Sequence, residues 1–317
     1  MDKVVHLPMG LMWQMPIPVA CSLAVAARGL AVSCGQCPLD DAGQVQHPGD
    51  AVGQARLVAG MVQGVLDHLP GHHAALLVVY HDAADAAQVL APLAAAFPGA
   101  ALAPVRLPHF YYPGMRIEVD LYAFAGRPEI DQTIGLSRVS GGPLELIALR
   151  AADQAGAEAL LAGFDPTRIL SAQWFAAEPA PEGWHPDPAA RVILPPEAGV
   201  TAVLTLAPAA VAVSQTPGGA LRRAGGGFVW LSAQGQGADL AAAAHQAMDA
   251  LALDDQPGLT LVKATTHYVG GPGPEDLHGN LAVRHARFPM PGPASTGVPV
   301  AGLAGGSLAI DMLGVEG

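Results

Sequence analysis

The sequence has little positive charge and almost no lysine. Of its 317 residues only 15 are lysine or arginine, against 27 aspartates and glutamates, and the formal net charge is -12. Lys3 and Lys263 are the only lysines. Binding of nucleic acid or of an anionic membrane surface depends on clustered basic side chains. We therefore expect neither as a partner.

Cysteine is also scarce, and long apolar runs are absent. The three cysteines, Cys21, Cys34 and Cys37, are too few and odd in number for the disulfide framework of a secreted protein. No apolar run reaches the length of about 18 residues that a transmembrane helix needs. We expect a cytoplasmic protein.

Hydrophobic residues make up 51% of the chain, which predicts a large folded core. Apolar side chains spaced by three and four predict a helix over 50–69, with Asp50 as its N-cap. A strand–helix–strand–helix–strand–strand order occurs in both terminal thirds. The first copy comprises 19–34 (a hairpin), 50–69, 75–80, 83–96, 101–107 and 115–123; the second comprises 228–231, 239–251, 259–269, 275–287, 296–303 and 307–313. This internal repeat predicts modules of roughly a hundred residues.

The middle of the chain is less regular. Its expected elements are strands over 144–149, 168–175 and 202–206 and a helix over 156–164. Residues 178–190 are rich in proline and are expected to form a surface loop. The predicted division is a module over 1–125, a degenerate partial module or connecting segment over 126–207, and a module over 208–317.

Short motifs recur in the same order in both terminal modules. The first contains Cys-Ser-Leu-Ala-Val at 21–25, Ser-Cys-Gly-Gln at 33–36 and Pro-Leu-Asp at 38–40; the second contains Ser-Ala-Gln at 232–234, Pro-Ala-Ser-Thr at 293–296 and Ile-Asp at 310–311. These stretches resemble the Rid (YjgF, L-PSP) family. The resemblance implies an α/β (α+β) fold of repeated ferredoxin-like, chorismate-mutase-like modules, each a mixed sheet backed by two helices. It also implies clefts between modules in an internal pseudo-trimer or a homotrimer of fused chains.

The resemblance further implies a catalytic acid on the last strand of a module. Glu118 and Asp311 occupy that position, and we expect them to be catalytic. In the family's deaminases an arginine that binds the substrate carboxylate lies sixteen residues earlier, where this chain has Leu102 and Ser295. The missing arginine argues against substrates with a free α-carboxylate.

Other residues are candidates for binding a small-molecule substrate. Asn280 and Arg284 lie one turn apart on a predicted helix and either supply the lost positive charge or form a solvated face. Arg191 follows the sequence Pro-Ala-Ala at 188–190. It is either a surviving family arginine or an exposed loop residue. The full expected set is Cys21, Cys34, Gly35, Leu102, Arg191, Ser232, Asn280, Arg284, Ser295 and Thr296.

The Cys-x-x-Cys spacing at 34–37 is typical of redox and zinc sites. No second such pair supplies further ligands, and in the family pattern these positions match serine and isoleucine. We expect no metal and no cofactor.

These observations favour a Rid-type hydrolase or deaminase acting on an imine, an enamine or a related C–N bond. Two alternatives stay open. One is a non-catalytic ligand-binding or interaction protein of the same fold, and the other is a chorismatase-like or ring-opening enzyme.

Overall fold

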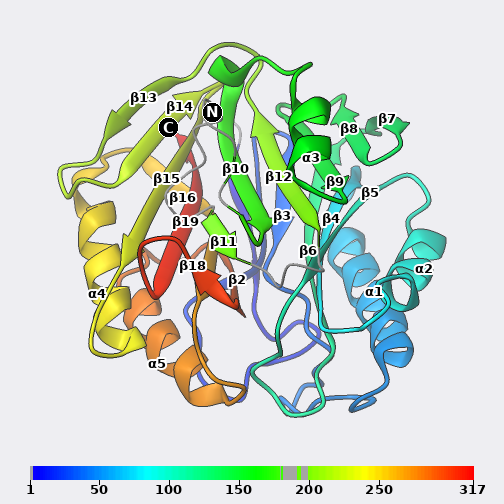
Figure 1. The fold of residues 1–317 in the computed structure, drawn as a ribbon. Helices are drawn as coiled ribbons and strands as arrows, with labels where there is room; N and C mark the ends of the chain where they lie inside the picture. Colours follow the sequence, from blue (N-terminus) through cyan, green and yellow to red (C-terminus); the bar gives the residue numbers. More distant parts are fainter. Residues whose placement is uncertain (1–2, 179, 181–190, 194–198) are drawn as a thin grey trace.

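The computed structural model describes residues 3–178, 180, 191–193 and 199–317, and of residues 191–193 the backbone alone. The fold is α+β, as the sequence predicted. Helices lie on the outside and strands fill the interior (Figure 1). The described α-helices are α1 (Ala51–Asp67), α2 (Ala87–Ala96), α3 (Gln154–Leu161), α4 (Leu240–Leu251) and α5 (Pro274–His285).

The larger sheet joins strands from both ends of the chain. Its order is β13-β14-β15-β19-β16-β17-β2-β3-β6-β4-β5, with β1 paired to β2. The strands from the first third are β1 (Val5–Pro8), β2 (Ser22–Ala27), β3 (Leu30–Ser33), β4 (His72–His81), β5 (Ala101–Arg106) and β6 (Ile117–Ala125). Those from the last third are β13 (Ala212–Gln215), β14 (Leu221–Gly225), β15 (Phe228–Gly235), β16 (Leu259–Tyr268), β17 (Ala294–Pro299) and β19 (Leu308–Glu316).

The smaller sheet is built mainly from the middle of the chain. Its order is β18-β11-β10-β12-β9-β8-β7. Its strands are β7 (Glu129–Thr133), β8 (Leu136–Ser140), β9 (Glu145–Ala151), β10 (Ile169–Ala176), β11 (Arg191–Ile193), β12 (Val200–Leu206) and β18 (Gly302–Leu303). The hairpins β7–β8 and β13–β14 were not predicted, because β7 and β13 are largely exposed and lack a buried apolar face.

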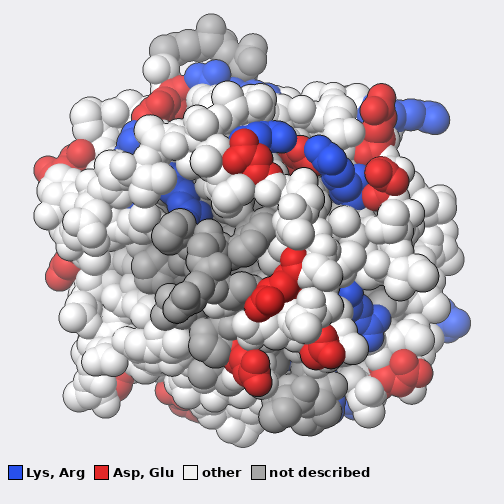
Figure 2. Space-filling view, turned by 45° about the horizontal axis from the view of Figure 1, so that its top comes forward, with Lys and Arg blue, Asp and Glu red and all other residues white. Residues whose placement is uncertain are grey.

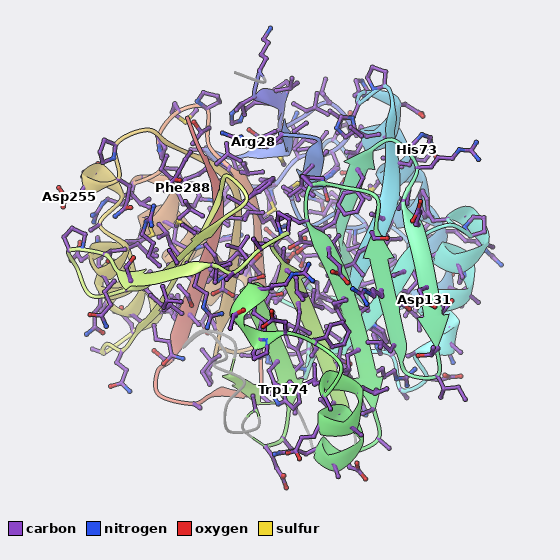
Figure 3. All side chains as sticks on the ribbon, turned by 90° about the horizontal axis from the view of Figure 1, so that it is seen from above. Arg28, His73, Asp131, Trp174, Asp255 and Phe288 are labelled. Carbon is purple, nitrogen blue, oxygen red and sulfur yellow. The ribbon has the colours of Figure 1, made fainter. Side chains whose placement is uncertain are left out.

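One strand order occurs three times. It is β2-β3-β6-β4-β5 in the first third, β8-β9-β12-β10-β11 in the middle and β14-β15-β19-β16-β17 in the last third. In each copy the final pair is parallel and the other three pairs are antiparallel. Seen from above, the labelled His73, Trp174 and Asp255 mark the three parts on different sides of the molecule (Figure 3). The described part of the middle copy has one α-helix, α3, whereas the first and last copies have two each.

Aspartate side chains begin three of the helices. Asp50, Asp153 and Asp239 each accept a hydrogen bond from a backbone N–H of the first helical turn, as predicted for Asp50. The predicted loop over 178–190 lies outside the described residues except for Glu178 and Ala180.

The described helices include none that is both long and apolar enough to cross a membrane. On the face in view in Figure 2, basic side chains lie among acidic ones rather than in a continuous basic field.

A buried ion pair joins the first and last thirds of the chain. Lys263 on β16 lies 2.8 Å from Asp120 on β6, and the two side chains are 1% and 2% exposed. The Lys263 ammonium also donates to the Ser33 carbonyl (2.8 Å) and to Thr296 Oγ1 (2.6 Å), and the Thr296 hydroxyl donates to Asp120 (2.5 Å). The two halves of the sheet meet where β17 pairs with β2, and β16 and β6 lie on either side of this junction.

Replacing Lys263 by methionine leaves the Asp120 carboxylate buried without its cation. We expect the free energy of unfolding to fall by about 3–5 kcal/mol, measured by urea denaturation. Lys3→Met, which removes the other lysine at an exposed position, is the matched control and should change little. A double variant, Lys263→Met with Asp120→Leu, should recover most of the loss, and equal instability of both variants would contradict this account.

Candidate functional site

A narrow cavity of about 30 Å³ lies between the first and last thirds of the chain. Glu118 on β6 and Gly35, which follows β3, face it from the first third. Arg284 on α5 and Ser295 on β17 face it from the last third. The cavity therefore depends on the seam between β2 and β17, and neither third alone encloses it.

Glu118 is held in a fixed orientation at the back of this cavity. Its side chain is 2% exposed, and the Tyr111 hydroxyl donates to Glu118 Oε2 at 3.0 Å. The Cys37 thiol lies 3.2 Å from the same hydroxyl. Gly35 packs directly on the carboxyl group, because a Cβ at this position would lie 1.7 Å from Oε1. Any larger residue at position 35 would displace the carboxyl.

Burial raises the pKa of Glu118 to about 8, and the nearby Asp120 acts in the same direction. The hydrogen bond from Tyr111 and the charge of Lys263 oppose this shift without cancelling it. At neutral pH the carboxyl therefore carries a proton. Glu118 can therefore donate a proton, and its buried side chain is shielded from bulk water.

Arg284 is fully buried on the opposite wall. Its Nε donates to Asn280 Oδ1 (3.0 Å) and its Nη1 donates to Ser295 Oγ (3.2 Å), while its Nη2 has no hydrogen-bond partner among the described residues. Burial lowers its pKa to about 10, so the guanidinium stays charged at neutral pH. A buried cation with an unused donor favours binding of an anionic ligand group.

The alternative of a solvated face for Asn280 and Arg284 is wrong, because both side chains are 0% exposed. The two residues lie one helical turn apart on α5, and Asn280 orients the guanidinium toward the cavity wall formed by β17. Arg284 thereby contacts Ser295, the position at which the sequence lacks the expected arginine. A helix residue thus brings a guanidinium to a position that the strand itself leaves uncharged.

The three cysteines also line the cavity. Burial raises the pKa of Cys21 to about 12 and raises the pKa values of Cys34 and Cys37 well above their usual range. They are therefore thiols rather than thiolates, which disfavours the nucleophilic or redox interpretation of the Cys-x-x-Cys spacing. The described part of the chain contains no group of three or more metal-type ligands.

The segment between β1 and β2 forms an apolar wall of the cavity. Met9, Trp13, Met15 and Val19 line it, and Leu277 and Leu281 of α5 face it. The Trp13 indole donates to Gln36 Oε1 at 3.2 Å, and Gln36 donates back to the Cys34 carbonyl at 3.0 Å. This pair of bonds fixes the segment over the end of β3.

The structure brings together some of the predicted site residues and separates others. Those that line the cavity are Glu118, Cys21, Cys34, Gly35, Arg284 and Ser295, and Asn280 contacts it through Arg284. Thr296, Ser232, Asp311 and Leu102 do not line it. The Thr296 hydroxyl is hydrogen-bonded to Lys263 and Asp120, and the Ser232 hydroxyl donates to Asp311 at 2.9 Å. Leu102 lies on β5 opposite Leu77. Arg191 begins β11, and its side chain lies outside the described residues.

Asp311 and Leu102 lie outside this cavity. Asp311 lies on β19, next to Ser232 on β15, and also accepts from Gln173 of β10 at 3.2 Å. These contacts join β19 to β15 of the last third and to β10 of the middle part of the chain. Equivalent positions in the repeated strand order therefore have different neighbours.

Sequence reasoning missed Tyr111, Trp13 and His285, which complete the cavity. Tyr111 belongs to a Phe-Tyr-Tyr run in a loop, and His285 follows Arg284 directly. The run of aromatics in a chain with only 5% aromatic residues was the available signal.

The raised pKa of Glu118 predicts a pH-dependent stability. The folded protein holds this proton more tightly than the unfolded chain, so the stabilisation is complete below about pH 4.5 and is lost as the pH rises toward 8. The difference in unfolding free energy between wild type and Glu118→Gln should change by a few kcal/mol across that window. Urea denaturation at several pH values measures it, and a difference that does not vary with pH would show that Glu118 ionises normally.

Comparisons with known proteins bear on the fold. No family model and no curated protein matches the sequence. Among solved structures, a chorismatase matches with a TM-score of 0.50 at 13% identity, over 77% of this chain and 93% of the chorismatase. The yeast protein Mmf1 matches at 16% identity and a TM-score of 0.33, over 38% of this chain and 98% of its own. A member of the YjgF/YER057c/UK114 family from Mycobacterium tuberculosis matches at 18% identity and a TM-score of 0.32, over 38% and 99%. At this identity, the likeness to the chorismatase is one of fold.

Proposed function

We propose that the protein is a small-molecule hydrolase that acts, in the cavity between the first and last thirds, on an imine or enamine bearing a carboxylate. One observation carries the proposal: a protonated, buried Glu118 and a buried Arg284 with an unused donor face the same cavity. The first supplies a proton and the second binds an anion.

Arg284 changes the expected substrate class. The sequence argued against a free α-carboxylate because Ser295 occupies the family's arginine position. The hydrogen bond from Arg284 Nη1 to Ser295 Oγ brings a guanidinium to that position. Nη2 is then the donor available to a substrate carboxylate, so carboxylate substrates belong to the proposal.

The chemistry assigns one role to each group. Glu118 donates its proton to the enamine carbon or the imine nitrogen, and a positive charge develops at the C–N carbon next to the carboxylate held by Arg284. Water adds to that carbon and gives a proton to the Glu118 carboxylate. Glu118 then gives this proton to the amine nitrogen of the adduct. The C–N bond breaks as the hydroxyl oxygen becomes the carbonyl and returns its proton to the Glu118 carboxylate, which releases ammonia or an amine and a 2-oxo acid. Tyr111 keeps the carboxyl oriented through its bond to Oε2.

A second candidate is hydrolysis of an enol ether, in which oxygen replaces nitrogen. The fold match that covers 93% of a chorismatase favours it. Protonation of the enol carbon followed by addition of water uses the same acid and the same carboxylate-binding group. Chorismate carries such an enol ether and would release pyruvate.

The test measures ammonia and 2-oxo acid release from freshly generated 2-iminopropanoate and, separately, pyruvate release from chorismate. Glu118→Gln keeps the shape of the acid but has no proton to transfer, so turnover of the true substrate should fall by about 10²–10⁴. Arg284→Met should lower kcat/KM mainly through KM. For wild type, kcat/KM should fall above about pH 8, where free Glu118 loses its proton.

Asp311→Asn provides the internal comparison, because Asp311 is another buried carboxyl on the last strand of a module but does not line this cavity. A loss of turnover in Asp311→Asn and not in Glu118→Gln would move the chemistry to β19 and overturn the proposal. Binding of both substrates without turnover by wild type would favour a non-catalytic ligand-binding protein instead.

A further inference from the structure

His285, next to Arg284 in the sequence, also lines the cavity and carries a second polar atom without a hydrogen-bond partner among the described residues. The backbone N–H of Ala20 donates to His285 Nδ1 at 3.1 Å. A backbone N–H only donates, so Nδ1 carries no proton, and in the neutral ring the proton must be on Nε2. Burial, together with the charge of Arg284, lowers the pKa of His285 to about 3, so the ring is neutral.

The Nε2–H group is buried and has no hydrogen-bond partner among the described residues. The ring is 8% exposed and packs against Phe288 with centroids 5.1 Å apart, which together with the Ala20 bond fixes its orientation. A buried donor without a partner costs free energy that a bound acceptor recovers. Like Arg284 Nη2, His285 Nε2 is therefore a donor available to a ligand atom.

We propose that His285 is a substrate-binding residue that recognises a second hydrogen-bond acceptor on the ligand, beside the carboxylate bound by Arg284. This inference rests on the proposed function for the carboxylate. It specifies the ligand class as a small carboxylic acid that carries a neutral oxygen acceptor close to the carboxylate, as 2-oxo acids and enol ethers do. The apolar wall of Trp13, Leu277 and Leu281 takes the rest of the molecule.

The neutral state of His285 matters for this selectivity. A protonated ring would add a second positive charge and select a dianion. A neutral Nε2–H donor selects an uncharged acceptor. The nearby titratable groups are Arg284, whose charge disfavours protonation of the ring, and Glu118 across the cavity, which is neutral at pH 7.

Two substitutions separate this role from a structural one. His285→Asn keeps an oxygen near the Nδ1 position for the Ala20 N–H and has no donor at the Nε2 position. His285→Gln does the reverse, with an amide NH₂ near the Nε2 position and no partner for Ala20. The ligands are pyruvate, which has a carboxylate and a ketone acceptor, and propanoate, which has the carboxylate alone, and calorimetric titration measures both affinities.

Wild type should bind pyruvate about tenfold more tightly than propanoate. His285→Asn should lose this preference with propanoate affinity unchanged, and His285→Gln should keep most of it. The opposite order of the two variants, or equal affinity of wild type for the two ligands, would overturn the role of His285 and leave Arg284 untouched. If wild type and Arg284→Met bind both ligands equally weakly, the carboxylate site of the proposed function fails, which is a separate result.

Discussion

The buried contact between Lys263 and Asp120 is the constraint on which the site depends. It joins β16 to β6 across the seam between the last and first thirds of the chain, with Ser33 and Thr296 as further partners of the ammonium. Two charges buried at 1% and 2% exposure tolerate little displacement. They fix the relative position of β6 and β17, and with it the distance across the cavity between Glu118 and Arg284.

Burial then sets the chemistry of the cavity. The same exclusion of water keeps Glu118 protonated, keeps the cysteines as thiols and keeps His285 neutral. Arg284 alone stays charged, because the intrinsic pKa of a guanidinium is high enough to survive the shift. The result is a site with one fixed cation and several neutral donors. It suits a small anion that must be protonated during the reaction.

The three copies of one strand order are not equivalent in surroundings. In the first copy the last strand carries Glu118 into the cavity, while in the third copy it turns Asp311 toward Ser232 and Gln173. Because the copies lie in one chain, their sequences differ, and each copy can make its own contacts. Arg284 on α5 is one such contact of the last third.

The sequence by itself determined most of the helices and strands and the α+β fold class. The helix cap at Asp50, the period of the apolar residues and the repeated motifs predicted the α+β fold, because these signals act over a few neighbouring residues. Only the tertiary structure decided which predicted residues share a site. It brought Arg284 to Ser295, added Tyr111 and His285, and moved Asp311 and Leu102 away, since these relations depend on how distant strands pair and on burial that no local pattern encodes.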